Sequence, residues 1–404
     1  MKQNYFMGLI ACAALTMTGC SNDEINAPQQ SQGNNAIEFS TYLGRNAQGS
    51  RGTETSTTSI QTSGFGVLAY YTEKADFADF ADTNKPNFMW NQKVTYDKTN
   101  TNWVYTPVKY WPTKVKDKVS FFAYAPYVEG GNANGIVLSK NNVAGAPIAT
   151  ITLPDDLSQT IDFVAAVQMN KTHDNSATAK NNVSFNLKHE MTRVKVQAKL
   201  DKLVYDANDA KKKTFVVIKD VKFNNNVKFY KSGIYTFSTD DSKRGTWAPV
   251  TDDSKTTSLD LNKAMETATI KAKDAKGATT SGDYMTGVNG VKLVDTTEKD
   301  LFKNNEYLYL IPVPVDGGDG LTATIEYDIV TEDSKLVAGY SCTSATKTVS
   351  LPAGAFQQGK SYNYTFIINL DEIVLDATVE QWDETASGND IKVPYSPDDA
   401  TKQN

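Results

Sequence analysis

The chain has 404 residues, a net charge of −6 at neutral pH and a hydrophobic content of 40%. This length predicts two domains, or three, and the apolar content is sufficient for ordinary globular cores. The negative charge argues against a nucleic-acid partner, and no segment beyond the N-terminal region is apolar enough to cross a membrane as a helix.

The first 19 residues have the pattern of a secretory signal peptide. A basic start precedes a short apolar run, Tyr5 to Met17, which is too short to span a bilayer. The run ends in Met17-Thr18-Gly19-Cys20, which resembles the lipobox of bacterial lipoproteins, although leucine is usual where Met17 stands. An ordinary signal peptide with a chance cysteine is the alternative. We expect residues 1–19 to be removed and Cys20 to become the lipidated first residue.

Beyond the signal peptide, the dominant pattern has a period of two. Hydrophobic residues alternate with polar ones at 37–43, 193–200, 321–329 and 362–370. Such alternation places one face of a strand on a core and the other in water. Many strands separated by glycine-rich turns predict an all-β protein made of sandwiches. The single helix candidate is Ser258–Lys273, where Thr267 and Thr269 fit a strand as well.

The strand pattern and the composition divide the chain. A strand that ends at Leu187 and another that opens at Thr192 place a boundary near residue 190. The polar stretch after Cys20 has little to bury and is expected to be disordered. We therefore predict a tether at 20–35, an N-terminal sandwich domain at 36–190, a C-terminal sandwich domain at 191–387 and a tail at 388–404.

Side chains suited to catalysis or metal binding are few. His173 lies in a polar loop and His189 at a strand end, which favours surface or strand-end packing over a metal site or a catalytic base. The sequence lacks the common hydrolase, zinc-protease, phosphate-loop and dinucleotide motifs. Cys342 lies in a strand-like run and is interpreted as a small packing residue rather than a nucleophile. We predict no enzyme and no catalytic, cofactor-binding or metal-binding residue.

The tryptophans leave two interpretations open. On a surface protein they could stack against sugar rings, and the chain would then be a surface glycan-binding β-sandwich lipoprotein. Aromatic residues also carry much of the buried area of sandwiches, and this favours positions in the core. The residues in question are Trp90, Trp103, Trp111, Trp247 and Trp382.

Several short stretches, in this order and together with the lipobox, resemble the fimbrillin family, the subunits of type V pili. None is specific alone, but they span nearly all of the chain beyond the signal peptide. The resemblance implies two transthyretin-like Greek-key β-sandwich domains and a lipid-anchored precursor at the outer membrane. It also implies cleavage by an arginine-specific protease, polymerisation by donor-strand exchange, other fimbrial subunits as partners, and adhesion to a host or bacterial receptor. The stretches are SGFGVLAY (63–70), YWP (110–112), VSFFAYAPY (119–127), FNLKH (185–189), YLYLIP (307–312), GKSY (359–362) and VEQW (379–382).

Arg45 and Arg51 are the candidate cleavage sites. They stand in a stretch rich in Gly, Ser, Thr and Gln that follows the alternating strand 37–43. Exposed flexible segments of small residues are where proteases cut. A cut there would free the first strand and leave a groove open to strand addition. Without the resemblance, an ordinary loop with two solvated arginines would be the preferred interpretation.

The candidate donor strand lies at the other terminus. Ile391, Val393 and Tyr395 alternate with Lys392 and Pro394 in the tail, and we expect the three larger side chains to enter a neighbour's groove. The competing donor is the stretch 373–379, which has the better strand pattern. The sequence does not distinguish a stalk subunit from a tip or anchor subunit.

Overall fold

The computed structural model describes residues 35–43, 54–173, 181–201, 214–266, 268–272, 284–303, 307–313, 320–332, 340–351, 356–369, 373–382 and 391–394. Over these residues the chain consists mainly of β-strands, and it contains one α-helix, α1 (Thr57–Ser63). The 3-10 turns are η1 (Phe77–Phe80), η2 (Glu129–Gly131), η3 (Leu157–Gln159), η4 (Asp252–Ser254) and η5 (Asn262–Ala264). The predicted all-β fold is thereby confirmed.

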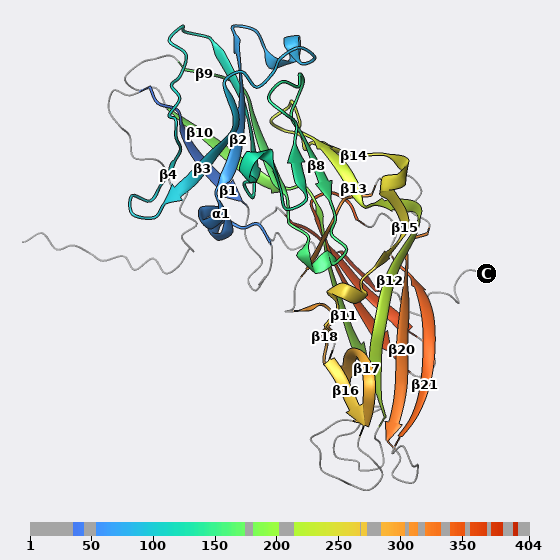
Figure 1. Cartoon of the computed structure of the whole chain (residues 1–404). Helices are drawn as coiled ribbons and strands as arrows, with labels where there is room; N and C mark the ends of the chain where they lie inside the picture. The colour runs from blue at the N-terminus through green and yellow to red at the C-terminus, as the bar shows by residue number, and fades with distance from the viewer. Residues whose placement is uncertain are drawn as a thin grey trace, which may run out of the picture.

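A seven-stranded sheet in the order β1-β10-β9-β5-β2-β3-β4 forms one layer of the upper body in Figure 1. Its neighbouring strands are antiparallel, except that β1 runs parallel to β10. Its strands are β1 (Glu38–Leu43), β2 (Phe65–Glu73), β3 (Met89–Asp97), β4 (Asn102–Val104), β5 (Lys118–Ala125), β9 (Val164–Thr172) and β10 (Asn182–His189).

A five-stranded sheet in the order β14-β13-β8-β7-β6 covers one face of this layer. Tyr70 and Phe122 from the larger sheet share one hydrophobic cluster with Ile151 and Tyr235 from the smaller one. The strands β13 and β14 lie beyond residue 190 in the chain, yet β13 pairs with β8, which lies before it. The domain boundary near residue 190 stays a prediction. The strands are β6 (Asn132–Ala133), β7 (Ile136–Leu138), β8 (Ile148–Thr152), β13 (Ser232–Thr236) and β14 (Thr246–Pro249).

The lower body in Figure 1 is formed by two further sheets. One has the order β18-β11-β22-β23-β24, with β19 also paired to β11; the other has the order β16-β17-β12-β20-β21, with β15 also paired to β12. Phe223 and Ile325 from the second sheet pack in one cluster with Tyr364 and Phe366 from the first. The first sheet contains β11 (Thr192–Leu200), β18 (Lys299–Asp300), β19 (Leu308–Leu310), β22 (Lys360–Ile368), β23 (Ile373–Gln381) and β24 (Ile391–Pro394). The second contains β12 (Thr214–Tyr230), β15 (Lys255–Asp260), β16 (Ala268–Ala272), β17 (Tyr284–Leu293), β20 (Thr322–Glu332) and β21 (Tyr340–Ser350).

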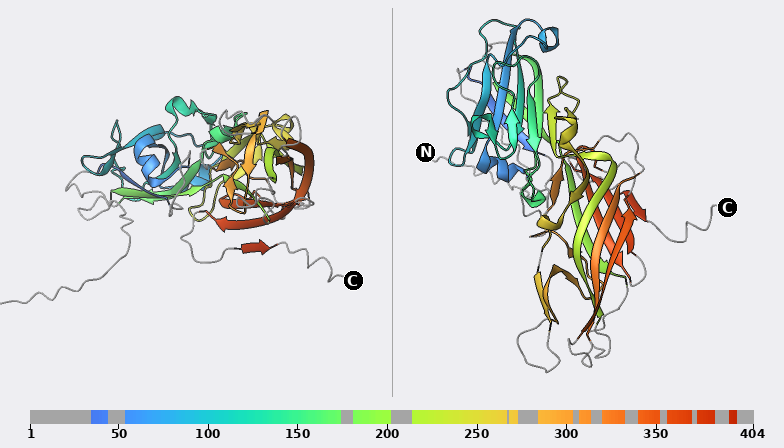
Figure 2. Two further views of the ribbon diagram at one scale, coloured as in Figure 1. Left: turned by 90° about the horizontal axis from the view of Figure 1, so that it is seen from below. Right: turned by 45° about the vertical axis from the view of Figure 1, so that its right-hand side comes forward.

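The long strand β12 leads from one body to the other. It has 17 residues, and its Phe223 and Phe229 pack in the lower cluster, whereas Tyr230 packs in the upper one. The right-hand view of Figure 2 shows how the chain rises along this strand and then enters the β13–β14 hairpin. The two bodies are therefore joined by a continuous strand as well as by packing.

The helix predicted at Ser258–Lys273 is wrong. This region contains the end of β15, the turn η5 and the strand β16. Leu259 lies opposite Phe223 of β12, and Met265 forms a bridge with Phe302. Leu259, Leu261 and Met265 are therefore buried through strand pairing and a tight turn. The β-branched residues near them favour extended backbone over a helix.

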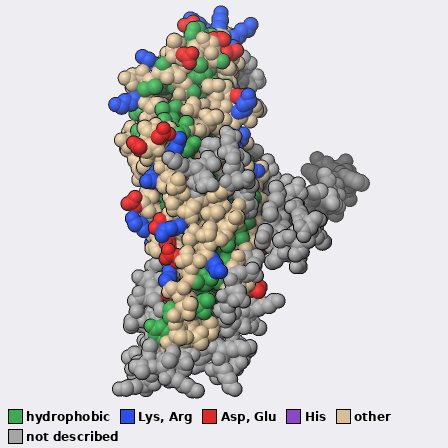
Figure 3. Space-filling view, turned by 90° about the vertical axis from the view of Figure 1, so that its right-hand side faces the viewer, with side chains coloured by type: hydrophobic (Ala, Val, Ile, Leu, Met, Phe, Trp, Pro, Cys, Tyr) green, Lys and Arg blue, Asp and Glu red, His purple; other side chains and the backbone are tan. Residues whose placement is uncertain are grey.

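Cys342 is exposed, so its interpretation as a packing residue is also wrong. It lies on β21, which ends its sheet's strand order and has mostly exposed side chains. Figure 3 shows the side of the molecule on which β21 lies, where uncharged polar side chains and backbone make up most of the surface that the described residues present in the lower half. A regular alternation in sequence cannot distinguish such an edge strand from a covered one.

Tyr364 allows a test of this core. It is fully buried, and among the described residues its hydroxyl has no hydrogen-bond partner. The hydroxyl of Tyr362, on the same strand, accepts a hydrogen bond from the Gln357 N–H at 3.1 Å. We expect Tyr364→Phe to leave the free energy of unfolding unchanged or raise it by about 1 kcal/mol, because it removes a buried unsatisfied group. Tyr362→Phe is the control and should lower it by about 0.5–1.5 kcal/mol. Urea denaturation measures both, and a larger loss for Tyr364→Phe would contradict the assignment.

Candidate assembly site: the first strand and the buried junction

The first strand is held differently at its two ends. Just before β1, the Ile37 N–H donates to the Lys109 carbonyl at 2.8 Å, and the Trp111 N–H donates to the Asn35 carbonyl at 2.8 Å. From Glu38 onward, β1 runs parallel to β10 over six residue pairs and ends the sheet's strand order. The strand that the sequence predicted to be removable is therefore an edge strand (Figure 1).

An aromatic socket surrounds Phe39 of this strand. Phe39 is 2% exposed, and Ile37 and Leu43 enter the same hydrophobic cluster. Burying each side chain of this size stabilises the folded state by about 1.5–3 kcal/mol. Loss of β1 would thus open an apolar groove in the body of the sheet. The rings around Phe39, with their centroid distances, are Tyr105 at 5.1 Å, Phe185 at 5.8 Å, Phe121 at 6.0 Å and Phe65 at 6.4 Å.

The hydroxyl of Tyr105 adds a polar contact to this groove. It donates to the Ile37 carbonyl at 2.8 Å and accepts from the Lys109 N–H at 3.2 Å. Burial raises the pKa of Tyr105 to about 12, so the group remains a neutral donor at physiological pH. The Tyr105 hydroxyl therefore fixes the backbone carbonyl of Ile37 at the start of the first strand.

The predicted cleavage and lipidation residues lie outside the described residues. These are Cys20, Arg45 and Arg51. The next described residues begin at Glu54, two positions before the Ser56 cap of α1. Glu54 and Thr55 are both buried.

Glu54 binds two distant parts of the chain. Its Oε1 accepts hydrogen bonds from Arg193 Nη1 at 2.8 Å and from Trp382 Nε1 at 2.9 Å, and Arg193 Nε donates to Ser361 Oγ at 3.0 Å. Glu54, Arg193 and Trp382 are 6%, 4% and 5% exposed. The guanidinium also lies 4.3 Å from the ring centroid of Tyr307. A buried charge requires this kind of pairing, because it has lost its hydration.

Asp162 lies beside this group and binds the next residue, Thr55. Asp162 Oδ2 accepts from the Thr55 N–H at 2.9 Å and lies 2.8 Å from His189 Nδ1. Burial raises the pKa of Asp162, and the nearby His189 opposes this shift. The imidazole of His189 stacks on Trp382, with centroids 3.8 Å apart. We call Glu54, Asp162, His189, Arg193 and Trp382 the junction.

The two histidines are packing residues. His189 ends β10 and is buried in the junction, which agrees with the predicted strand-end packing. His173 is buried and stacks on Trp111 at 5.4 Å, so a surface position is wrong for it. Within the described ranges, no group of three or more His, Cys, Asp or Glu side chains is arranged to hold a metal ion. In the same ranges, no helix has the length and apolarity needed to cross a membrane.

The tail is described at one short strand. In β24, Val393 lies opposite Ala377 of β23 and Ile391 lies opposite Val379, in antiparallel register. Tyr395 lies outside the described residues. Figure 2 shows β24 as the outermost strand of its sheet. The competing donor, 373–379, belongs to β23, whose Leu375 and Ala377 are buried in the lower core.

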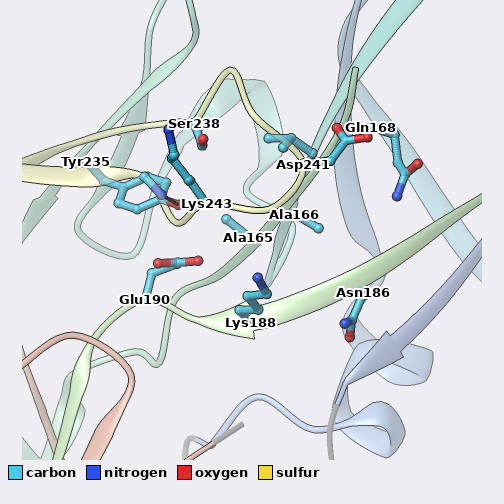
Figure 4. A pocket seen from close by; sticks show the side chains of 12 residues that line it. Ala165, Ala166, Gln168, Asn186, Lys188, Glu190, Tyr235, Ser238, Asp241 and Lys243 are labelled. Carbon is cyan, nitrogen blue, oxygen red and sulfur yellow. Dashed lines mark hydrogen bonds between the residues drawn. The ribbon is translucent and has the colours of Figure 1, made fainter. Parts of the chain in front are cut away.

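Among the described residues, the tryptophans and the two pockets form no obvious platform for a sugar ring. Trp111 and Trp382 are buried, and the other three tryptophans are half-buried. The pocket in Figure 4 has a volume of about 70 Å³, with Lys188, Lys243 and Glu190 in its wall. Pockets for small molecules usually measure about 300–1,000 Å³. A wider hollow of about 630 Å³ has no aromatic or charged side chain in its lining, which comprises Asn134, Gly135, Ile136, Ile151, Thr152, Leu153, Pro154, Gln159, Thr160 and Ile161.

Sequence reasoning missed the junction. Glu54, Asp162 and Arg193 are far apart in the chain, and each has an ordinary local context as a charged residue. The sequence contains one indication of a buried carboxylate: Asp162 stands between Ile161 and the apolar run that begins at Phe163. A single carboxylate inside a buried strand pattern predicts a buried polar contact. The identity of its partners could not be inferred without the fold.

The socket gives a direct test of the role of β1. Phe39→Ala should lower the free energy of unfolding by about 3–5 kcal/mol, because it empties the centre of an aromatic cluster. Tyr42→Ala is the matched control, since Tyr42 lies on the same strand and is only half-buried. Thermal and urea unfolding measure both variants. Equal losses for the two would show that β1 is not held by this socket.

Comparison with known proteins identifies the family of this chain. The chain matches the family model described as fimbrillin-like over residues 53–382. It is 29% identical over 403 residues to the fimbrium subunit Fim1C of Phocaeicola vulgatus, covering 95% of this chain and 98% of that protein. It is also similar to the crystal structure of a fimbrial protein from Bacteroides vulgatus, with a TM-score of 0.66 and 26% identity, covering 86% of this chain and 100% of that one. The chain belongs to the fimbrillin-like family.

Proposed function

We propose that this protein is a structural fimbrial subunit that reaches the cell surface as a lipoprotein, is cut after Arg45 or Arg51, and polymerises by donor-strand exchange to support adhesion. Family membership supports the fimbrial role. The proposed cleavage and strand exchange rest on one observation: β1 is an edge strand that fills an aromatic groove. The segment that bears both arginines follows this strand directly.

The position of β1 makes it replaceable. As the last strand in the order of its sheet, it can leave without breaking the pairing of any other described strand. Its departure leaves the backbone groups of β10 unpaired on that side and opens the socket around Phe39. An open strand edge beside an apolar groove favours the addition of another strand. Each new backbone hydrogen bond would contribute about 0.5–1.5 kcal/mol net.

Anchoring is assigned to Cys20, which ends the lipobox-like sequence. Lipid chains bind a bilayer through their buried methylene groups, and stable attachment needs more than a single acyl chain. Residues 20–35 then connect this anchor to the first strand, as the tether predicted from composition. The proposed location is therefore the outer membrane for the precursor and the fimbrium for the assembled subunit.

The tail is the proposed donor. Ile391 and Val393 lie on β24, at the outer edge of its sheet, so they can leave without disturbing a covered strand. The stretch 373–379 lies between two strands and contributes buried side chains to the lower core. Withdrawal of that stretch would expose the core of the subunit that donates it. The proposed partners are other fimbrial subunits, with a host or bacterial surface receptor for the finished fimbrium.

Processing is tested by replacing both arginines. We expect Arg45→Lys with Arg51→Lys to retain the first strand and to block polymer formation, because the charge is kept while the arginine that the protease recognises is lost. N-terminal sequencing of the protein from cells and gel analysis of polymers measure the outcome. The two single variants serve as controls and identify the arginine that is cut. Normal polymers from the double variant would refute arginine-dependent processing.

The donor is tested in the tail. We expect Ile391→Asp with Val393→Asp to give a stable monomer that cannot extend a fibre, because an unpaired charge in an apolar groove costs several kcal/mol. Lys392→Asp is the matched control, since it lies between them in the alternating pattern and should still polymerise. Polymer length and thermal stability are measured for each. Full-length fibres from the double variant would exclude these residues as the donor.

A further inference from the structure

The residues that lead into β1 are bound by a segment that does not belong to β10. This segment, residues 105–111, lies between β4 and β5 in the chain, and we call it the latch. It forms three hydrogen bonds with the backbone of residues 35–37, and two of them bind the N–H and the carbonyl of the same residue, Ile37. These bonds run from the Ile37 N–H to the Lys109 carbonyl at 2.8 Å, from the Trp111 N–H to the Asn35 carbonyl at 2.8 Å, and from the Tyr105 hydroxyl to the Ile37 carbonyl at 2.8 Å.

The other end of β1 lacks a comparable set of contacts. Apart from the pairing with β10, the one hydrogen bond that the described residues make to the backbone of 39–43 runs from Thr57 Oγ1 to the Leu43 carbonyl. Its length is 3.5 Å, which is beyond the usual range for a hydrogen bond. Side chains at both ends, Ile37 and Leu43, are buried, so the two ends differ mainly in their hydrogen bonds. A strand end with fewer such bonds opens locally at a lower cost.

The latch has the contacts to release the strand while the Lys109 carbonyl stays paired. Its two ends are fixed, since Tyr105 and Trp111 are 9% and 4% exposed, whereas Tyr110 is 54% exposed. The Tyr105 hydroxyl accepts from the Lys109 N–H at 3.2 Å and also lies 3.2 Å from the Lys109 carbonyl. When Ile37 leaves, this hydroxyl can donate to that carbonyl and replace the lost N–H. Release therefore leaves fewer buried polar groups unpaired, which lowers its cost.

We propose that β1 opens from its C-terminal end, at Leu43, and that the latch releases residues 35–37 last, with the Tyr105 hydroxyl as the contact that sets this order. The role of this order in strand exchange rests on the proposed function. Both candidate cleavage arginines follow Leu43 in the chain. A cut after either removes a covalent link from the end that opens first, while the latch retains the strand until another strand displaces it. The incoming strand then enters beside Leu187, the partner of Leu43 on β10.

The order of opening is measured by amide hydrogen exchange in the full, uncut chain, with mass-spectrometric fragmentation that separates single residues. The Glu38 N–H donates to the Asn181 carbonyl at 3.0 Å, and because alternate residues of a strand face the same side, the Tyr42 N–H faces β10 as well. Both amides thus report on the same strand pairing at opposite ends of β1. After correction for intrinsic rates, we expect Tyr42 to exchange at least about tenfold faster than Glu38. Equal rates, or faster exchange at Glu38, would overturn the proposal.

The latch is tested by Tyr105→Phe, which removes the hydroxyl and keeps the aromatic ring in its cluster. We expect exchange at Ile37 and Glu38 to accelerate by about three- to tenfold, the factor that corresponds to one lost hydrogen bond, and exchange at Tyr42 to stay unchanged. A substitution that weakened the whole fold would accelerate all three amides alike. Uniform acceleration, or no change at Ile37 and Glu38, would overturn the role of the latch.

Tyr70→Phe is the matched control, because it removes a hydroxyl that donates to the Gly145 carbonyl at 3.0 Å in the other cluster of the upper body. It should leave the difference between the two ends of β1 intact. If Tyr105→Phe does not fold, the comparison of Tyr42 with Glu38 in the unchanged protein still decides the proposal. Because that chain is uncut, the result does not depend on cleavage. Polymers that form without the two arginines would refute the proposed processing and leave the order of opening standing.

Discussion

The hydrogen bonds between Glu54, Arg193 and Trp382 are the contact on which the arrangement of the molecule depends. They join the start of the upper body, the first strand of the lower body and the end of β23 at one buried carboxylate. Loss of any one partner would leave a charge or a donor unpaired away from water, at a cost of several kcal/mol. The two sandwich-like bodies are therefore fixed to each other by polar contacts as well as by the strand that runs between them.

This fixed junction contrasts with the way β1 is held. The strand is attached mainly by apolar side chains in a preformed socket and by backbone pairing on one side. These contacts require a strand with apolar side chains at alternate positions, but they do not require that the strand belong to the same chain. Another strand with a similar pattern could make them. The first strand is bound by contacts that another strand could make, whereas the junction is bound by contacts that require particular side chains.

The alternating pattern was sufficient to predict strands and the all-β class, because the period of two follows directly from backbone geometry. It failed where apolar spacing fits two structures, as at Ser258–Lys273, and where exposure depends on the position of a strand in its sheet, as at Cys342. The socket around Phe39 was partly predictable, since the first strand was identified from its own alternation. The junction could not be predicted, because its charged residues lie far apart in the sequence and come together only in the fold. Cys20, Arg45 and Arg51 are assigned from the sequence alone.

The strand β12 has a mechanical consequence. It pairs with β20 over ten residue positions and runs along the length of the lower body before it enters the upper one (Figure 1). A pull along the length of that body acts parallel to these two strands, so the hydrogen bonds between them are loaded in shear and share the force. A pull across the strands would instead break these hydrogen bonds one after another. A molecule built around such a strand resists stretching most strongly along its own long direction.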